Sequence, residues 1–298
     1  MNQDLLDEYH AVRGGAGFYE QKRGLIAVSG KEAVQFLNGL VTNDVGKLET
    51  DGQMLAAFPN AQGRLLAIVR VLKSGDKFLF ETAAETREKV FNNLFRFTYA
   101  GDFFVEDWSD DFRYFQVLNF KSPISNSAFI EFQNNFGRNV FVTNDAAEDF
   151  TKELKNQTAV KISDELYEVL RIENGEPLYG IDADETTIVP ELGIENLISY
   201  QKGCYIGQEI IARIHFRGHI AKQLTGLILE TEAEPNDELK SPDGKNAGRI
   251  TSVTFSPKLG KFIALAFVRY DYLAEGTELK VNETTATVKH LPFAEQIS

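Results

Sequence analysis

The chain has 298 residues, which is enough for two or three packed units. Its hydrophobic content of 43% and charged content of 25% are ordinary for a globular protein. Its formal net charge of −13 argues against broad nucleic-acid binding, because a phosphate backbone would be repelled. The single cysteine excludes an intramolecular disulfide, and it cannot by itself hold an iron–sulfur cluster or a structural zinc, which need about four ligands.

The N-terminal stretch MNQDLLDEYHAVRGG is acidic and polar. It lacks the basic and apolar regions of a secretory signal peptide, and the chain contains no run of eighteen apolar residues. We therefore expect a cytoplasmic protein without a membrane span.

Helices and hairpins are predicted over the next part of the chain. Apolar residues at helical spacing follow Ser29 and Gly30, either of which is a plausible N-cap. Two strand-like runs flank Ser74-Gly75-Asp76, a turn sequence that favours a β-hairpin. The patterns predict, in order, a helix over residues 31–40, a hairpin over residues 63–82, a helix over residues 83–97 and a strand over residues 112–120.

A further helix is predicted from Ser163, with Ser163 as its N-cap and acidic residues in its first turn. It should stop at Gly175, since Pro177 follows. The next acidic run, DADE at residues 182–185, lacks the spacing of a metal site, and we expect it to be a solvated loop.

After about residue 220 the pattern changes to short strands joined by Gly, Pro and Asp turns, which is typical of a small β-barrel or sandwich. The first part has no βαβ alternation, so we assign it to the α+β class. The predicted domains are residues 1–219 and residues 220–298.

The only cysteine lies in QKGCYIGQEIIARIHFRGH, residues 201–219. Gly203 and Gly207 permit a tight turn, and a helix should begin near Gly207 with Glu209 in its first turn. The helix N-terminus and the charge of Lys202 would both favour a thiolate at an exposed Cys204. The alternative is a buried, inert Cys204 in an ordinary turn. No histidine is close enough in sequence to be nominated as its base.

The window from Lys202 to Lys222 has a formal charge of +3 and contains His215 and His219. One interpretation is that this positively charged window binds an anionic ligand. The other is that it is a solvated basic face.

K-G-C-Y-I-G-Q-E, residues 202–209, resembles the signature of the YgfZ family of folate-binding proteins, which are related to the glycine-cleavage T protein, an aminomethyltransferase that depends on tetrahydrofolate. The resemblance covers essentially the whole chain. It includes RGLIAVSGKEAVQFLNGLVTNDV, RIENGEPLYGIDADETTIVPEL and AGRITSVTFSPKLGKFIALAFVRY.

The resemblance implies two interlocked folate-binding subdomains around a central channel, followed by a β-barrel. It implies tetrahydrofolate or a derivative as ligand, with Lys202 and Cys204 as the functional pair. Phe58, Tyr179 and Tyr205 would line an apolar channel with a basic mouth, or they would be core residues. The residues expected to contact folate are Arg171, Tyr179, Lys202, Gly203, Tyr205, Gly207, Gln208, Glu209 and Asn60.

The YgfZ family is implicated in assembling or maintaining iron–sulfur clusters in a subset of enzymes, including tRNA-modifying ones. The resemblance therefore implies an accessory protein whose partners are reduced folate and iron–sulfur enzymes or cluster-carrier proteins. Arg171 is the residue similar to a folate-facing arginine of the T protein, although it could instead pair with Glu168 or Glu173.

Two departures separate the chain from the T-protein pattern. The T protein follows an Asn-x-x-Gly turn with an aspartate, whereas Asn60 and Gly63 are followed here by Ala67 and Ile68, which cannot transfer a proton. The stretch comparable to a Gly-Glu motif, NNFGRNVFV, has no carboxylate. Two alternatives stay open. One is an aminomethyltransferase or other one-carbon transferase, in which Asp44 would substitute for the aspartate unless it is only a turn residue. The other is a non-enzymatic scaffold without a ligand.

Overall fold

The computed structural model describes residues 2–120, 129–134 and 136–293, so Asn135 of the NNFGRNVFV stretch lies outside the described residues. The chain forms two compact units, neither of them continuous in sequence. Unit 1 comprises Met1–Gln21, Arg113–Asp182 and Ala221–Ser298, and unit 2 comprises Lys22–Phe112 and Ala183–Ile220.

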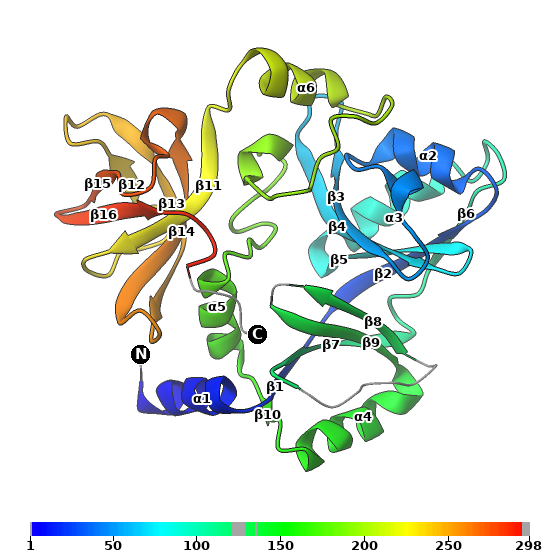
Figure 1. Ribbon diagram of the computed structural model, residues 1–298, viewed down its shortest axis with the longest axis horizontal. Coiled ribbons are helices and arrows are strands. Elements are labelled where there is room, and N and C mark those ends of the chain that lie inside the picture. The colour runs from blue at the N-terminus through cyan, green and yellow to red at the C-terminus, as the bar shows by residue number, and fades with distance from the viewer. Residues whose placement is uncertain (1, 121–128, 135, 294–298) are drawn as a thin grey trace. The chain divides into compact units, whose positions relative to one another are not determined.

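Unit 2 contains a five-stranded sheet in the order β3-β4-β5-β2-β6, with antiparallel neighbours (Figure 1). The predicted hairpin is confirmed, since β4 and β5 pair up to Ser74 and Lys77. Apolar residues of α2 and α3 pack with the sheet in one core. The elements are β2 (Arg23–Ser29), α2 (Ala33–Leu40), η1 (Val45–Lys47), β3 (Gln53–Pro59), β4 (Leu65–Ser74), β5 (Lys77–Ala83), η2 (Ala84–Thr86), α3 (Arg87–Phe95), β6 (Phe104–Asp107), η3 (Val189–Leu192) and α6 (Gln208–Arg217).

The first sheet of unit 1 has the order β10-β1-β7-β9-β8, in which β1 runs parallel to β10 and antiparallel to β7. The amphipathic helix α4 packs Ala147, Phe150 and Leu154 into the core with β1, β7 and β9. The elements are α1 (Gln3–Gly14), β1 (Gly17–Gln21), β7 (Phe112–Leu118), β8 (Phe129–Asn134), β9 (Gly137–Thr143), α4 (Asn144–Asn156), β10 (Val160–Lys161) and α5 (Asp164–Glu173).

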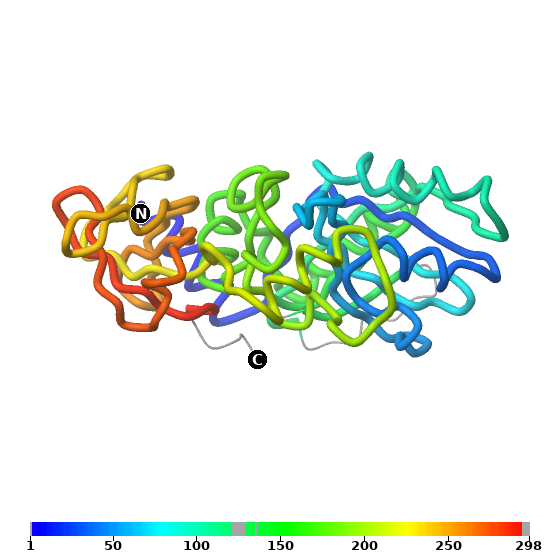
Figure 2. Tube along the Cα trace, turned by 90° about the horizontal axis from the view of Figure 1, so that it is seen from above, coloured from blue at the N-terminus to red at the C-terminus, as the bar shows by residue number. Residues whose placement is uncertain are grey.

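The C-terminal part of unit 1 is a closed barrel in the order β11-β14-β13-β12-β15-β16, traced from yellow to red in Figure 2. This confirms the α+β class with a C-terminal β-barrel. Leu239 is the buried residue of β12, a strand too short to show alternation in the sequence, so it was not predicted. The elements are β11 (Lys222–Leu229), β12 (Glu238–Lys240), β13 (Asn246–Ser256), β14 (Lys261–Arg269), η4 (Tyr270–Tyr272), β15 (Glu278–Val281) and β16 (Thr284–Lys289).

Helix ends agree with the sequence where capping residues mark them. The side chain of Ser163 accepts a hydrogen bond from the Leu166 N–H and begins α5, as predicted. The expected cap of α2 is wrong, because its N-cap is Glu32 and neither Ser29 nor Gly30. Within the described part of the chain, no helix is both long and apolar enough to cross a membrane.

Candidate functional site

The K-G-C-Y-I-G-Q-E loop of unit 2 leads into α6, which begins at Gln208, close to the predicted start at Gly207. Gly207 is the N-cap of α6 and has a φ of +79°, a backbone conformation that side-chain-bearing residues rarely adopt. A Cβ on Gly207 would lie 2.3 Å from the carbonyl oxygen of Asn60. The loop therefore packs directly on the Asn60–Gly63 turn, which brings together two of the predicted motifs.

The side chain of Asn60 holds that turn in shape. Its Oδ1 accepts hydrogen bonds from the N–H groups of Gln62, at 2.9 Å, and Arg64, at 3.0 Å. The Gly63 N–H donates to the Asn60 carbonyl at 2.9 Å. The sequence predicts Asn60 as a folate contact, but in the structure its Oδ1 atom stabilises the turn. Its contact with folate stays a prediction.

Lys202 points its ammonium group into the protein. Its Nζ donates to the carbonyl oxygens of Val41 and Asn43, each at 2.7 Å, and the residue is 9% exposed. Burial lowers the pKa of Lys202 to about 8, while the negative charge of Asp44 acts in the opposite direction. The ammonium also lies 5.1 Å from the centre of the Tyr205 ring.

Cys204 is exposed, so its interpretation as a small buried hydrophobe is wrong. Gly203 beside it is open, since nothing lies within 4 Å of a Cβ built on it. The Gln208 side chain donates to the Gly203 carbonyl at 3.4 Å, and Glu209 is exposed in the first turn of α6. The loop thus presents a thiol to solvent while its lysine is turned inward.

Tyr205 of the same loop is also turned inward, since it is only 8% exposed, and burial raises the pKa of its phenol. The three isoleucines of α6 are buried to different degrees. Ile211 is fully buried, and Ile210 and Ile214 are half-buried. Phe58 packs in the core of unit 2 with its ring 5.9 Å from that of Phe80, as in the core interpretation.

The predicted basic face on α6 is exposed and partly aromatic. Arg213 and Arg217 are exposed, whereas Lys202 is buried and does not contribute to this face. The rings of Tyr200 and His215 stack at 3.6 Å, and Phe216 lies edge-on to both. This aromatic cluster had no signal in the sequence, because Tyr200 precedes the helix by eight residues.

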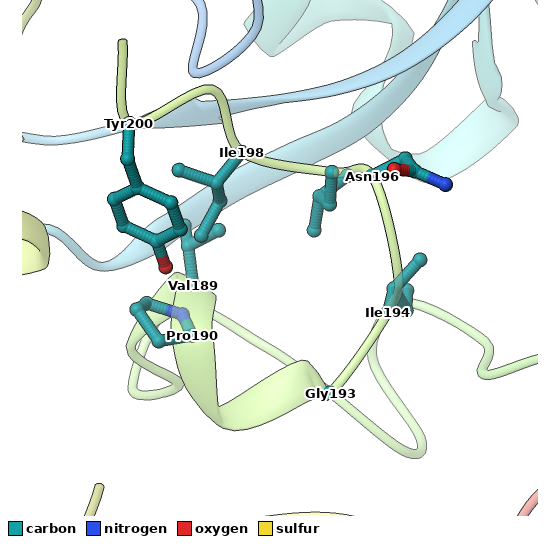
Figure 3. A pocket seen from close by; sticks show the side chains of 8 residues that line it. Val189, Pro190, Gly193, Ile194, Asn196, Ile198 and Tyr200 are labelled. Atoms are coloured by element: carbon teal, nitrogen blue, oxygen red, sulfur yellow. The ribbon is translucent and has the colours of Figure 1, made fainter. Parts of the chain in front are cut away.

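A pocket in unit 2, open to solvent at its mouth, lies between η3 and the following loop (Figure 3). Its lining combines apolar side chains with polar atoms, and Tyr200 stands at one side of it. None of the predicted site residues lines this pocket. The lining residues are Val189, Pro190, Gly193, Ile194, Asn196, Leu197, Ile198 and Tyr200.

Arg171 and Tyr179 belong to unit 1, where Tyr179 is half-buried and Arg171 is fully buried. The anticipated pairing of Arg171 with Glu168 is present. The guanidinium also donates to Asp182 at 2.8 Å, to Ser252 of β13 at 2.8 Å and to the Glu176 carbonyl at 3.1 Å.

These contacts use all five N–H donors of Arg171. A folate carboxylate would therefore have to replace one of them, and the contact of Arg171 with folate stays a prediction.

The expectation of a solvated DADE loop is wrong for Asp182, which is 1% exposed. Its carboxylate accepts from Arg171, from the hydroxyls of Thr251 and Ser252 at 2.5 and 2.7 Å, and from the Leu178 N–H at 2.9 Å. Such a set of donors stabilises a buried carboxylate. Among the residues that the structure describes, no group of three or more His, Cys, Asp or Glu could hold a metal ion.

Glu173, two residues after Arg171, is a second buried carboxylate, and the sequence suggests it only as a partner of Arg171. It accepts instead from Tyr9, from Arg13 and, at 2.5 Å, from Ser256 of the barrel. The cluster around Arg171 and the cluster around Glu173 thus both connect α5 to β13, through Ser252 and Ser256 respectively. Their sequence signal is the charged pair Arg171 and Glu173 on a helix with apolar neighbours.

The residues fit a reduced folate only in part. At Ala67, where the resemblance expects an aspartate, the structure has a fully buried methyl group on β4. Lys202, the nominated cation, has two of its three donors on backbone carbonyls. The loop therefore offers a thiol and, at the N-terminus of α6, the polar side chains of Gln208 and Glu209.

Comparison with known proteins gives a consistent result along the chain. Residues 1–122 match the GCVT N-terminal domain, and residues 222–294 match the glycine cleavage T-protein C-terminal barrel domain. An aminomethyltransferase from Thermoanaerobacter pseudethanolicus is 27% identical, with 94% of this chain and 85% of that protein aligned. One from Caldanaerobacter subterraneus subsp. tengcongensis is 26% identical, with 94% and 84% aligned.

The crystal structure of glycine cleavage system aminomethyltransferase T from Bartonella henselae superimposes with a TM-score of 0.89. The match covers 98% of this chain and 90% of that chain at 18% identity, so it shows a common fold. With matches to the N-terminal domain and to the barrel domain, the chain belongs to the glycine-cleavage T-protein-like family.

Proposed function

We propose that this protein binds tetrahydrofolate or a derivative and acts in one-carbon chemistry of the aminomethyltransferase type. The observation that carries the proposal is the alignment of 94% of the chain with proteins named aminomethyltransferase, together with the matches to both T-protein domains. Reduced folate is the ligand that this family relationship implies.

The geometry limits how such a transfer would proceed. Ala67 cannot accept a proton, so another group has to act near the folate nitrogen. Lys202 has a pKa of about 8 and can hold or release a proton near neutral pH. Asp44, the carboxylate whose charge acts on Lys202, is half-buried and accepts from Asn38 and from the Gly46 N–H. Asp44 is therefore the candidate for proton transfer, since the ammonium of Lys202 is held by two backbone carbonyls.

A second candidate function is supported by a specific observation, the exposed Cys204 in a loop that resembles the YgfZ signature. In this proposal the protein binds tetrahydrofolate as an accessory to the assembly or repair of iron–sulfur clusters, and its partners are iron–sulfur enzymes or cluster carriers. The absence of a carboxylate at Ala67 supports it, because an accessory role does not require the proton transfer that aminomethyl transfer does.

Two measurements separate the candidates. The first is anaerobic titration calorimetry of the purified protein with tetrahydrofolate, for which we expect saturable micromolar binding. The second is tetrahydrofolate-dependent methylene transfer in a reconstituted assay. Binding with transfer supports the aminomethyltransferase. Binding without transfer, together with reduced iron–sulfur enzyme activities in cells that lack the protein, supports the accessory role. A folded protein that does not bind folate overturns both and leaves a scaffold.

A further inference from the structure

Helix α2 ends without a cation of its own. Its last turn contains no basic residue, although the carbonyl groups at a helix C-terminus lack intrahelical partners and carry a partial negative charge. The Val41 N–H satisfies one of these carbonyls, that of Leu37, at 3.1 Å. The others need partners from elsewhere in the chain.

The K-G-C-Y-I-G-Q-E loop supplies partners for two carbonyls at this end of the helix, those of Gly39 and Val41. The Ile206 N–H donates to the Gly39 carbonyl at 3.1 Å, and the Lys202 ammonium bridges the carbonyls of Val41 and Asn43. A cation near a helix C-terminus interacts favourably with the helix dipole. Lys202 thus provides, from 161 positions away in sequence, the charge that α2 lacks.

The segment that precedes Lys202 is tied to the same turn. The Ser199 N–H donates to the Thr42 carbonyl at 3.0 Å. The Thr42 hydroxyl donates to the Leu197 carbonyl at 2.7 Å, and the Asn43 side chain reaches the Asn196 carbonyl at 2.7 Å. Hydrogen bonds on both sides of Cys204 therefore hold the loop against the end of α2. The Lys202 side chain donates two of them.

We propose that Lys202 is a positioning residue, whose buried ammonium ties the loop to the C-terminus of α2 and so fixes where Cys204 meets solvent. This inference rests on the proposed function in one respect, which is that the functional site lies at this loop. Because Lys202 is turned inward, a loss of ligand binding on its replacement would follow from displacement of the loop.

The test compares Lys202→Met, Lys202→Arg and Lys47→Met with the wild type. Lys47 lies near the same Asp44, at 3.8 Å, but is 65% exposed and contacts none of the carbonyls above, so it controls for loss of charge. The readouts are hydrogen exchange at the Ser199 and Ile206 amides and the rate of Cys204 alkylation by iodoacetamide at one fixed pH.

We expect Lys202→Met to speed exchange at both amides by about tenfold or more, as for loss of charge-assisted hydrogen bonds, and to change the alkylation rate. Lys47→Met should behave as the wild type, and Lys202→Arg should restore part of the protection because it keeps the charge. Wild-type protection of both amides in Lys202→Met would overturn the inference.

The wild type offers a test that needs no folded variant. After correction for intrinsic exchange rates, protection of the Ser199 and Ile206 amides should rise as the pH rises through 8, because Lys202 has a lowered pKa only while it is buried, and opening of the loop would return it to the ordinary lysine pKa. Constant protection from pH 7 to pH 9.5 would contradict the tie. A protein that shows these effects without binding folate would overturn the proposed function and leave this inference intact.

Discussion

The α-carbon of Gly207 faces the carbonyl oxygen of Asn60, so closely that a Cβ on Gly207 would lie 2.3 Å from it. Two motifs that are far apart in sequence are thereby packed backbone to backbone. The positive φ of Gly207 adds an independent reason for glycine, because this residue must also turn the chain into α6. Nothing comparable constrains Gly203, the other glycine of the loop.

We therefore predict that Gly207→Ala destabilises the protein by at least about 2 kcal/mol, from backbone strain together with the clash at Asn60. Gly203→Ala is the matched control, since its Cβ would meet nothing within 4 Å, and we expect it to be nearly neutral. Urea denaturation measures both free energies of unfolding. Equal stability of the two variants would contradict the packing of Gly207 on Asn60.

Local features of this region could be predicted from the sequence, whereas its long-range contacts could not. The start of α6 at Gly207 depends on neighbouring residues, and the hairpin at Ser74 depends on its turn sequence. The partners of Lys202 are backbone carbonyls 161 and 159 positions away, and a carbonyl group is the same in every residue. No pattern in the sequence identifies which of them a lysine will find.

The same distinction applies to Arg171. Its pairing with Glu168 was open to prediction, because residues three apart share a helix face. Its pairing with Asp182 was not, since a run of four charged or small residues normally indicates a solvated loop. Burial of Asp182 becomes favourable only when β13 brings the hydroxyls of Thr251 and Ser252 to it.

Replacement of Arg171 should destabilise unit 1 whether or not folate binds. We predict that Arg171→Met costs about 3–5 kcal/mol, because it leaves the fully buried Asp182 carboxylate without its cation. Arg113→Met removes a comparable but half-exposed arginine that pairs with Glu20 and Glu148, and it should cost about 0–1 kcal/mol. Chemical denaturation distinguishes the two. An Arg171→Met protein of wild-type stability that fails to bind folate would instead make Arg171 a ligand contact.

The stability of the protein should depend on pH through Lys202. Its pKa is about 8 in the folded chain and 10.5 when unperturbed, so between these values the unfolded chain binds more protons. Raising the pH then stabilises the folded state, by at most about 3 kcal/mol over the whole interval. We expect the stability difference between wild type and Lys202→Met to shift in favour of the wild type from pH 7 to pH 9.5.

Thermal unfolding at several pH values measures that difference. Burial also raises the pKa of Tyr205, which makes the folded state lose stability as the pH rises through the ordinary tyrosine range. Both proteins share this tyrosine, so its effect cancels in the difference. A constant difference across the interval would show that Lys202 does not titrate there.

The thiol of Cys204 should react as a single accessible group without denaturant, because it is exposed and is the only cysteine in the chain. We predict that Cys204→Ala changes the free energy of unfolding by no more than about 0.5 kcal/mol, as is usual for exposed positions. The same variant should abolish activity in cells, since the thiol is the reactive group that the loop presents to solvent. Cys204→Ser, which keeps the size but not the nucleophilic sulfur, should be equally inactive. A fully active Cys204→Ala protein would exclude a chemical role for the thiol and assign the loop to binding alone.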